Sequence, residues 1–333
     1  MHLGRNCMAA ADLATEPEQP KAAAGPSFLE ELKDCWHQFP EKGLFFGLII
    51  PWLLLFQFLG NSTFGYVNSP SLYLWLEGAY NSPFQDDDHG PYIPFLVLGL
   101  CWWKRKELLA APKRLWWPGL IILGAACLLH VLGYIVQQPR LSVAALFMGI
   151  YGLIGVTWGP AFLRAIFFPY FLFMFSVPIG SLSGMVTFPL RMVVTKVAVG
   201  IAQFLGVGVI QDGSRILDEA GKFNYDVAPA CSGIRSLVAM FLLATVYAFV
   251  IFKQWWPRLI VIGMAMPLAV LGNVVRLTTI ILVGKAFGHD AGVMIEQKFG
   301  FVTFAVALAG MYGISTVLER VVFRKKKTKE TPV

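Results

Sequence analysis

The sequence predicts an all-α polytopic membrane protein. Hydrophobic residues make up 56% of the 333 residues, charged residues make up only 14%, and the mean hydropathy is +0.63. This composition is too apolar for a soluble domain, and the chain is too long for a single membrane span. The basic residues also stand in short clusters between apolar runs, as the loop charges of membrane proteins do.

About eight transmembrane helices are expected from the apolar runs. The expected spans cover residues 43–60, 92–103, 117–136, 141–158, 161–177, 232–252, 258–283 and 299–318. The second span ends in two tryptophans followed by Lys104, Arg105 and Lys106, which is an interfacial aromatic anchor before cytoplasmic positive charge. We therefore expect the loop 61–90 outside the membrane and both chain ends in the cytoplasm.

The segment 185–205 does not fit this alternation. It is long enough to span, but it carries Arg191 and Lys196, which are costly at bilayer depth. Lys253 and Arg258 should be cytoplasmic, so the span 232–252 runs inward and begins on the outer side of the membrane. Both ends of the segment 185–205 then lie on the outer side. We therefore predict a re-entrant or interfacial element here rather than a crossing. If the segment does span, one of the other expected spans is wrong.

The two ends of the chain differ from the membrane domain between them. Residues 1–43 are polar and rich in Ala, Pro and Glu, and no apolar stretch lies early enough for a cleavable signal peptide. We expect them to form a disordered cytoplasmic tail. The membrane domain is expected over 44–319, followed by a basic cytoplasmic tail over 320–333.

Several other functions find no support in the composition. The net charge of +7 is divided among loop clusters and forms no nucleic-acid face. Five cysteines without paired spacing predict neither a disulfide framework nor a metal site. The run Asp86-Asp87-Asp88-His89 contains cation ligands, but no second cluster accompanies it, and we interpret it as a solvated loop. No cofactor, metal or nucleic acid is expected.

The stretch 227–237 is the first candidate for chemistry. It reads Val-Ala-Pro-Ala-Cys-Ser-Gly-Ile-Arg-Ser-Leu and lies where the polar loop 206–230 gives way to an apolar run. The loop alternates Phe223 and Tyr225 with polar residues, which predicts a short hairpin that brings Cys231 to the membrane surface. A thiol at such a boundary reaches water beside low-dielectric surroundings, so Cys231 is the candidate nucleophile.

Two residues from separate stretches fall on the same outer side as Cys231. Arg276 lies within the apolar span 258–283, and His289 lies in the short outer loop expected after it. Histidine titrates near neutrality and is the usual base for a thiol. A protonated arginine in an apolar wall suits the stabilisation of a tetrahedral intermediate or the lowering of the pKa of Cys231.

Each candidate also has a purely structural interpretation. Cys231 could be a packing residue, Arg276 could reach the interface from a helix end, and His289 could be a surface residue. Arg235 lies on the helical face of Cys231 and could assist the thiolate, bind substrate or anchor the helix. Asn273 could orient Arg276 or bridge two helices.

At these residues the sequence resembles the exosortase/archaeosortase family, over about residues 44–318. The resemblance rests on Ala230-Cys231-Ser232-Gly233-Ile234-Arg235-Ser236, on Pro267-Leu268-Ala269 leading to Asn273-Val274-Val275-Arg276-Leu277, on His289 with Gly292 and Phe299, and on His89-Gly90 before the second span. It implies that Cys231 is the nucleophile, Arg276 the essential arginine and His289 the third member. The supporting or substrate-binding candidates are Arg235, Asn273, Ser232 and His89.

The resemblance implies a membrane-embedded cysteine protease or transpeptidase. Its partners would be membrane-anchored exported proteins with a C-terminal signal, which consists of a short motif such as Pro-Glu-Pro, a transmembrane helix and a basic tail. Cleavage through an acyl-enzyme would take place at the outer face of a bacterial plasma (inner) membrane, since the histidine form is the bacterial one. A substrate confined to the bilayer by its own helix needs little affinity in solution.

A transporter, or a scaffold for envelope polysaccharide assembly, is the competing interpretation. Arg191, Lys196 and Arg276 would then line a polar path through the membrane. The thiol separates the two functions, because a transporter should tolerate Cys231→Ser far better than a cysteine transpeptidase does.

Overall fold

The computed structural model describes residues 27–63, 69–82, 87–179, 184–226, 234–298 and 300–329. The chain divides into two units, residues 1–39 and 40–333. In the first unit, helix α1 (Phe28–His37) begins with a capping box, because the Ser27 hydroxyl accepts the Glu30 N–H and the Glu30 carboxylate accepts the Ser27 N–H. Helix α1 lies within residues 1–43, for which the sequence predicts a disordered cytoplasmic tail, and its cap satisfies the first turn of this polar segment.

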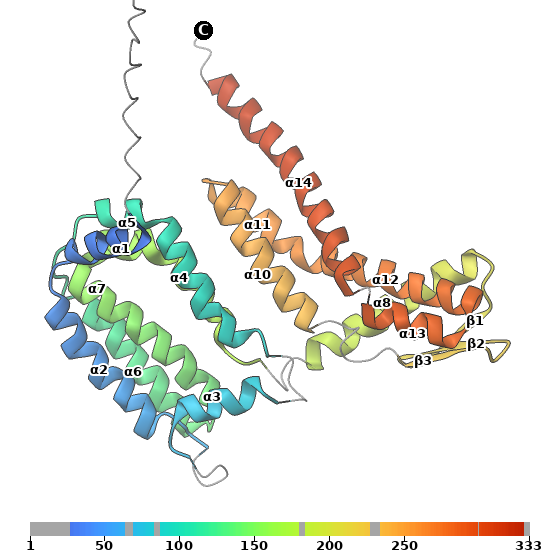
Figure 1. The fold of residues 1–333 in the computed structure, drawn as a ribbon, viewed down its shortest axis with the longest axis horizontal. Helices are drawn as coiled ribbons and strands as arrows, with labels where there is room; N and C mark the ends of the chain where they lie inside the picture. The colour runs from blue at the N-terminus through green and yellow to red at the C-terminus, as the bar shows by residue number, and fades with distance from the viewer. Residues whose placement is uncertain are drawn as a thin grey trace, which may run out of the picture. The chain divides into compact units, whose positions relative to one another are not determined.

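The second unit consists of helices and one small sheet (Figure 1). Its first half contains α2 (Lys42–Leu59), α3 (Leu72–Tyr80), η1 (Gly90–Tyr92), α4 (Ile93–Trp103), α5 (Arg105–Ala110), α6 (Gly119–Ile135), α7 (Pro139–Phe171) and η2 (Leu172–Ser176). Its second half contains α8 (Gly184–Phe204), β1 (Val209–Asp212), β2 (Arg215–Asp218), β3 (Asn224–Asp226), α10 (Ile234–Ile251), α11 (Trp255–Gly263), α12 (Ala265–Phe287), α13 (His289–Lys298) and α14 (Gly300–Lys329).

Four helical stretches are long and apolar enough to cross a membrane. In the described part of the chain they are Lys42–Leu59, Pro139–Ser176, Trp255–Phe287 and Gly300–Val321, and the shorter apolar helices are Gly90–Trp103, Gly119–Ile135 and Leu237–Ile251. The chain is therefore a helical, multi-pass membrane protein. The count of eight spans and the re-entrant or interfacial placement of α8 stay predictions.

The element α7 consists of two antiparallel arms joined at Gly159. This glycine has φ 84° and precedes a proline, so the helix reverses at this point. Across the arms, the Tyr151 hydroxyl donates to the Leu163 carbonyl at 3.0 Å, and the Tyr170 hydroxyl donates to the Phe147 carbonyl at 2.6 Å. The arms correspond to the two segments, before and after the glycine, that the sequence predicts as separate spans.

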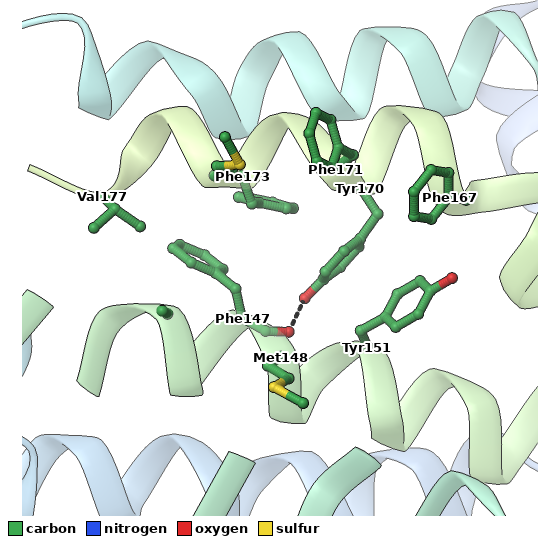
Figure 2. Close-up of a pocket in the computed structure, with 10 residues that line it drawn as sticks. Phe147, Met148, Tyr151, Phe167, Tyr170, Phe171, Phe173 and Val177 are labelled. Atoms are coloured by element: carbon green, nitrogen blue, oxygen red, sulfur yellow. Dashed lines mark hydrogen bonds between the residues drawn. The ribbon is translucent and has the colours of Figure 1, made fainter. Parts of the chain in front are cut away.

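An apolar cavity of about 290 Å³ lies between the two arms of α7 (Figure 2). Aromatic and methionine side chains of both arms and of η2 line it, among them Phe147 and Met148 of the first arm and Phe173 of η2. Because the hydroxyls of Tyr151 and Tyr170 donate to backbone carbonyls, they are satisfied without a ligand. The hairpin is thus held by a few hydrogen bonds and by stacked rings.

Tight helix packing builds the rest of the first half. Helices α6 and α7 run side by side (Figure 1). The Trp52 indole of α2 donates to the Leu146 carbonyl at 3.0 Å and lies over Gly149, where a Cβ would come within 2.0 Å of the ring. His130 and Ser142 form a buried hydrogen bond of 3.0 Å between α6 and α7. These polar contacts fix the register of helices whose surfaces are otherwise apolar.

Two apolar clusters organise the second half, and α12 belongs to both. One joins α12 to α8 and the sheet, with Val194, Ala198, Val199 and Ala202 of α8 against Val274, Leu277, Ile280 and Ile281 of α12. The other joins α12 to α10, α11 and α14, through Met240, Ala244, Val261, Leu268, Ala307 and Met311 among others. The helix that carries Arg276 is therefore packed on several sides.

The loop before Cys231 contains the predicted hairpin and one strand more. Strand β1 pairs antiparallel with β2 through a two-residue turn in which Gly213 has φ 60°, a conformation that favours glycine. Strand β2 then pairs antiparallel with β3, which places Ile216 opposite Tyr225. Both of these side chains are buried on the face of the sheet that packs on the helices.

Two expected loops contain helices. The outer loop predicted after residue 283 is helical on both sides of Gly288, because α12 continues to Phe287 and α13 begins at His289. Gly288 has φ 96° and allows the reversal between these helices. The loop 61–90 contains α3, whose first turn is capped by the Ser71 hydroxyl.

Candidate active site

Four of the seven candidate site residues are described with their side chains, and three are not. Cys231 and Ser232 lie outside the described residues, and only the backbone of Arg235 is described, in the first turn of α10. The structure describes the other four candidates, His89, Asn273, Arg276 and His289. Three of these four lie on α12 and α13.

Arg276 lies half-buried on α12 with its guanidinium directed to α13. Its Nη2 donates to the Glu296 carbonyl at 2.6 Å. Its Nε is buried and has no hydrogen-bond partner among the described residues. A guanidinium carries five N–H donors, so Arg276 has donor capacity beyond its bond to α13.

Asn273 lies one turn before Arg276 and is fully buried. Its Oδ1 accepts a hydrogen bond from the Thr303 hydroxyl of α14 at 3.4 Å. The two helices approach closely here, because a Cβ on Gly272 would come within 2.7 Å of the Thr303 carbonyl. Asn273 could orient Arg276 or bridge two helices, and the hydrogen bond to Thr303 is a contact of the bridging kind.

His289 opens α13 and presents an exposed imidazole at the end of the sheet. Its ring stacks on the Tyr225 ring of β3, with centroids 5.1 Å apart and planes at 13°. The Tyr225 hydroxyl donates to the His289 carbonyl at 3.1 Å. Strand β3 ends at Asp226, five residues before Cys231, so the histidine is attached to the strand that leads to the candidate nucleophile.

Tyr225 is the residue of this region that sequence reasoning missed as a site residue. Its signal was the alternation with Phe223, whose ring stacks on it at 5.0 Å. Burial raises the pKa of the Tyr225 phenol, and the carboxylates of Glu296 and Asp290 raise it further, so the hydroxyl remains a hydrogen-bond donor at neutral pH.

Arg276 and His289 lie on the two helices of the α12–α13 hairpin, at different positions along its length. Arg276 contacts α13 at Glu296, seven residues after His289, which corresponds to about 10 Å along the helix. The structure gives no direct contact between the two side chains in the described part of the chain. The hairpin nevertheless fixes a cation and an imidazole on elements joined to the strand before Cys231.

The family model described as transmembrane exosortase matches residues 82–313, more than two thirds of the chain. The chain belongs to the transmembrane exosortase family. The matched part of this exosortase includes Cys231, the α12–α13 hairpin and the sheet beside it. No curated protein and no solved structure gives a significant match.

His89 of the exosortase contacts η2, the short helix that follows α7. Its Nε2 lies 3.1 Å from the Phe175 carbonyl, and its Nδ1 is buried without a partner among the described residues. The adjacent Gly90 lies against the Tyr80 ring, where a Cβ would come within 2.1 Å. The described contacts of His89 are with η2, and none of them is with α12 or α13.

The acidic run before His89 is only partly a solvated loop. Asp87 is 1% exposed, and its Oδ1 accepts the Ile179 N–H at 3.0 Å, whereas Asp88 is exposed. Asp86 lies outside the described residues. The part of the chain that the structure describes contains no cluster of three or more residues able to hold a metal ion.

An ion pair attaches the sheet to α12 near His289. The Lys285 Nζ lies 3.1 Å from Oδ1 of Asp218, whose side chain is fully buried. Burial alone would raise the pKa of Asp218, but the hydrogen bond from the Lys222 N–H and the bond and charge of Lys285 outweigh it and hold the pKa below its usual range. The ionised carboxylate therefore stabilises the folded site.

We expect Asp218→Asn to lower the midpoint of thermal unfolding at neutral pH, by roughly 2–4 °C. Because the folded pKa is depressed, the carboxylate stabilises the protein above its ordinary pKa of about 4 and loses this effect as the pH falls through the folded value. Melting curves in detergent at several pH values should therefore converge on the acid side. Asp212→Asn, an exposed change in the same sheet, is the control, and a gap that is constant with pH would contradict the assignment.

Proposed function

We propose that this exosortase is a membrane-embedded cysteine protease or transpeptidase that cleaves the C-terminal sorting signals of exported proteins. Its substrates are membrane-anchored proteins with a motif, a transmembrane helix and a basic tail. The reaction takes place at the outer face of a bacterial inner membrane, with both chain ends in the cytoplasm, as the distribution of loop charges favours.

In this reaction the Cys231 thiolate attacks the carbonyl carbon of the scissile peptide bond. His289 takes the thiol proton and later donates it to the departing amine, while Arg276 stabilises the oxyanion of the tetrahedral intermediate. Expulsion of the amine leaves an acyl-enzyme thioester on Cys231. An acceptor nucleophile or water then attacks the thioester, releases the product and regenerates the thiol.

The observation that supports this mechanism best is the burial and hydrogen bonding of the Arg276 guanidinium. Its guanidinium is partly buried, bonded to α13 by one donor, and retains a buried Nε without a partner among the described residues. Burying an unpaired donor costs free energy, so an anion that forms next to it is stabilised. A fixed, protonated donor suits a transition state that develops negative charge.

The direct test is to follow a tagged exported protein with a C-terminal signal from the same genome in membranes that contain this exosortase. We expect a product with a new C terminus, and a hydroxylamine-labile acyl adduct on the peptide that contains Cys231, both identified by mass spectrometry. Substrate that stays at full length beside properly inserted protein would refute the proposal. Cleavage that continues at the wild-type rate after Cys231→Ala would refute Cys231 as the nucleophile, although the protein would still be a protease.

A transporter or polysaccharide-assembly scaffold remains the second candidate because of one observation. Arg191 on α8 has a buried Nε without a hydrogen-bond partner in the part of the chain that the structure describes. Buried charged side chains are also found along the transport paths of membrane proteins. The same experiment separates the candidates, since this alternative predicts no shortened product and no adduct.

A further inference from the structure

Tyr225 lies where three elements of the candidate site meet. Its side chain projects from β3 and is only 4% exposed, whereas His289 on α13 is exposed. One face of its ring stacks on the imidazole, and its hydroxyl donates to the backbone carbonyl of the same histidine. The tyrosine therefore contacts His289 twice, once at its imidazole ring and once at its backbone carbonyl.

The α12–α13 hairpin is shaped to receive this side chain. Gly284 of α12 and Gly292 of α13 both face the Tyr225 hydroxyl, and a Cβ at these positions would come within 2.3 Å and 1.9 Å of Oη. A side chain on either glycine would therefore displace the phenol. Figure 1 shows the strands beside α13, and the ion pair between Asp218 and Lys285 joins the sheet to α12 at the same end.

The stack also limits how the imidazole can turn. An exposed histidine ordinarily samples several rotamers, each of which points its ring nitrogens in a different direction. Here Phe223, Tyr225 and His289 form a series of stacked rings, with interplanar angles of 25° and 13°. A base held in one orientation is more often in the geometry that allows proton transfer. Misplacement of a catalytic group by about 1 Å can lower the reaction rate a hundredfold.

We propose that Tyr225 is a positioning residue that orients the His289 imidazole toward the strand leading to Cys231. The inference rests on the proposed function, because it requires His289 to act as the base for the thiol. Tyr225 touches neither substrate nor thiol in this role; it acts through the histidine. Gly284 and Gly292 serve the same purpose by leaving room for the phenol.

The test measures the reactivity of the Cys231 thiol, which needs no substrate and remains measurable in inactive variants. The full chain in membranes is alkylated with iodoacetamide near neutral pH, and the rate at the Cys231 peptide is followed by mass spectrometry. The variants are Tyr225→Phe, Tyr225→Leu, His289→Ala and the double variant Tyr225→Leu with His289→Ala. Tyr312→Leu, a change of an exposed tyrosine on α14, is the matched control.

We expect Tyr225→Leu to slow alkylation about tenfold, because the ring stack is lost. Tyr225→Phe keeps the stack and loses only the hydroxyl bond, so it should slow alkylation no more than roughly fivefold. In the double variant the rate should equal that of His289→Ala alone, since a residue that acts through the imidazole has no effect once the imidazole is gone. Tyr312→Leu should leave the rate unchanged.

Three results would contradict the proposal, and they can be told apart. If Tyr225→Leu slows alkylation equally with and without His289, the tyrosine supports the fold in general. If both Tyr225 variants react like wild type while His289→Ala is slow, the positioning role fails and the proposed function stands. If His289→Ala itself reacts like wild type, the base assignment fails and the positioning role with it.

Discussion

Replacing Cys231 with alanine is expected to leave the sorting-signal substrate at full length in the membrane. Alanine has no nucleophile, so no acyl-enzyme can form, and residual hydrolysis should be lower than wild type by at least about a thousandfold. The measurement is an immunoblot of a tagged substrate over time in cells that contain equal amounts of each enzyme variant. Cys231→Ser should be nearly as inactive, because a hydroxyl is a far weaker nucleophile near neutral pH.

Cys127→Ala is the matched control for the cysteine change. Cys127 is a free, exposed cysteine on α6, so its replacement removes a thiol without removing the candidate nucleophile. We expect this variant to process substrate like wild type. Normal processing by Cys231→Ala would refute the assignment of Cys231 as the nucleophile.

Replacing Arg276 with lysine is expected to lower the rate of processing about a hundredfold although the charge is conserved. The guanidinium donates to the Glu296 carbonyl and keeps a second, buried donor in a fixed direction, and an ammonium group cannot place donors at both positions. Because the proposed interaction with the oxyanion is made only in the transition state, kcat should fall while KM changes little. Steady-state kinetics on a peptide substrate in detergent would measure the two constants.

Arg320→Lys provides the comparison for this change, because Arg320 is an exposed arginine on α14. Its kinetics should match those of wild type. If Arg276→Lys retains wild-type kcat, Arg276 contributes only charge or packing, and the oxyanion role would have to be assigned to another group. A rise in KM alone would instead indicate that Arg276 binds the substrate in its ground state.

The membrane character of the chain could be predicted because it depends on composition. Long apolar runs predict helices in a bilayer without reference to any other part of the chain, and the arms of α7 on either side of Gly159 follow that rule. The hairpin before Cys231 was predictable for a similar reason, since the alternation of Phe223 and Tyr225 is local. The family resemblance likewise depended on short motifs.

The contacts that build the candidate site were not predictable in the same way. The hydrogen bond of Arg276 to the Glu296 carbonyl and the space left by Gly284 and Gly292 depend on how α12 and α13 fold against each other. A polar sequence such as residues 289–298 carries no hydropathy signal, so it was expected to be a loop. The burial of Asp87 was not predictable for the same reason, because its carboxylate accepts a hydrogen bond from the N–H of Ile179, which is distant in the sequence.

The link between Tyr225 and His289 also determines when the site can exist during synthesis. The two residues are 64 positions apart, and the bond from Arg276 to Glu296 closes only when α13 has been made. Such non-local contacts form late, after the intervening chain has left the ribosome and entered the membrane. The nascent protein therefore contains its cysteine well before the groups that are proposed to activate it, and a chain whose synthesis stops before α13 would lack the assembled candidate site.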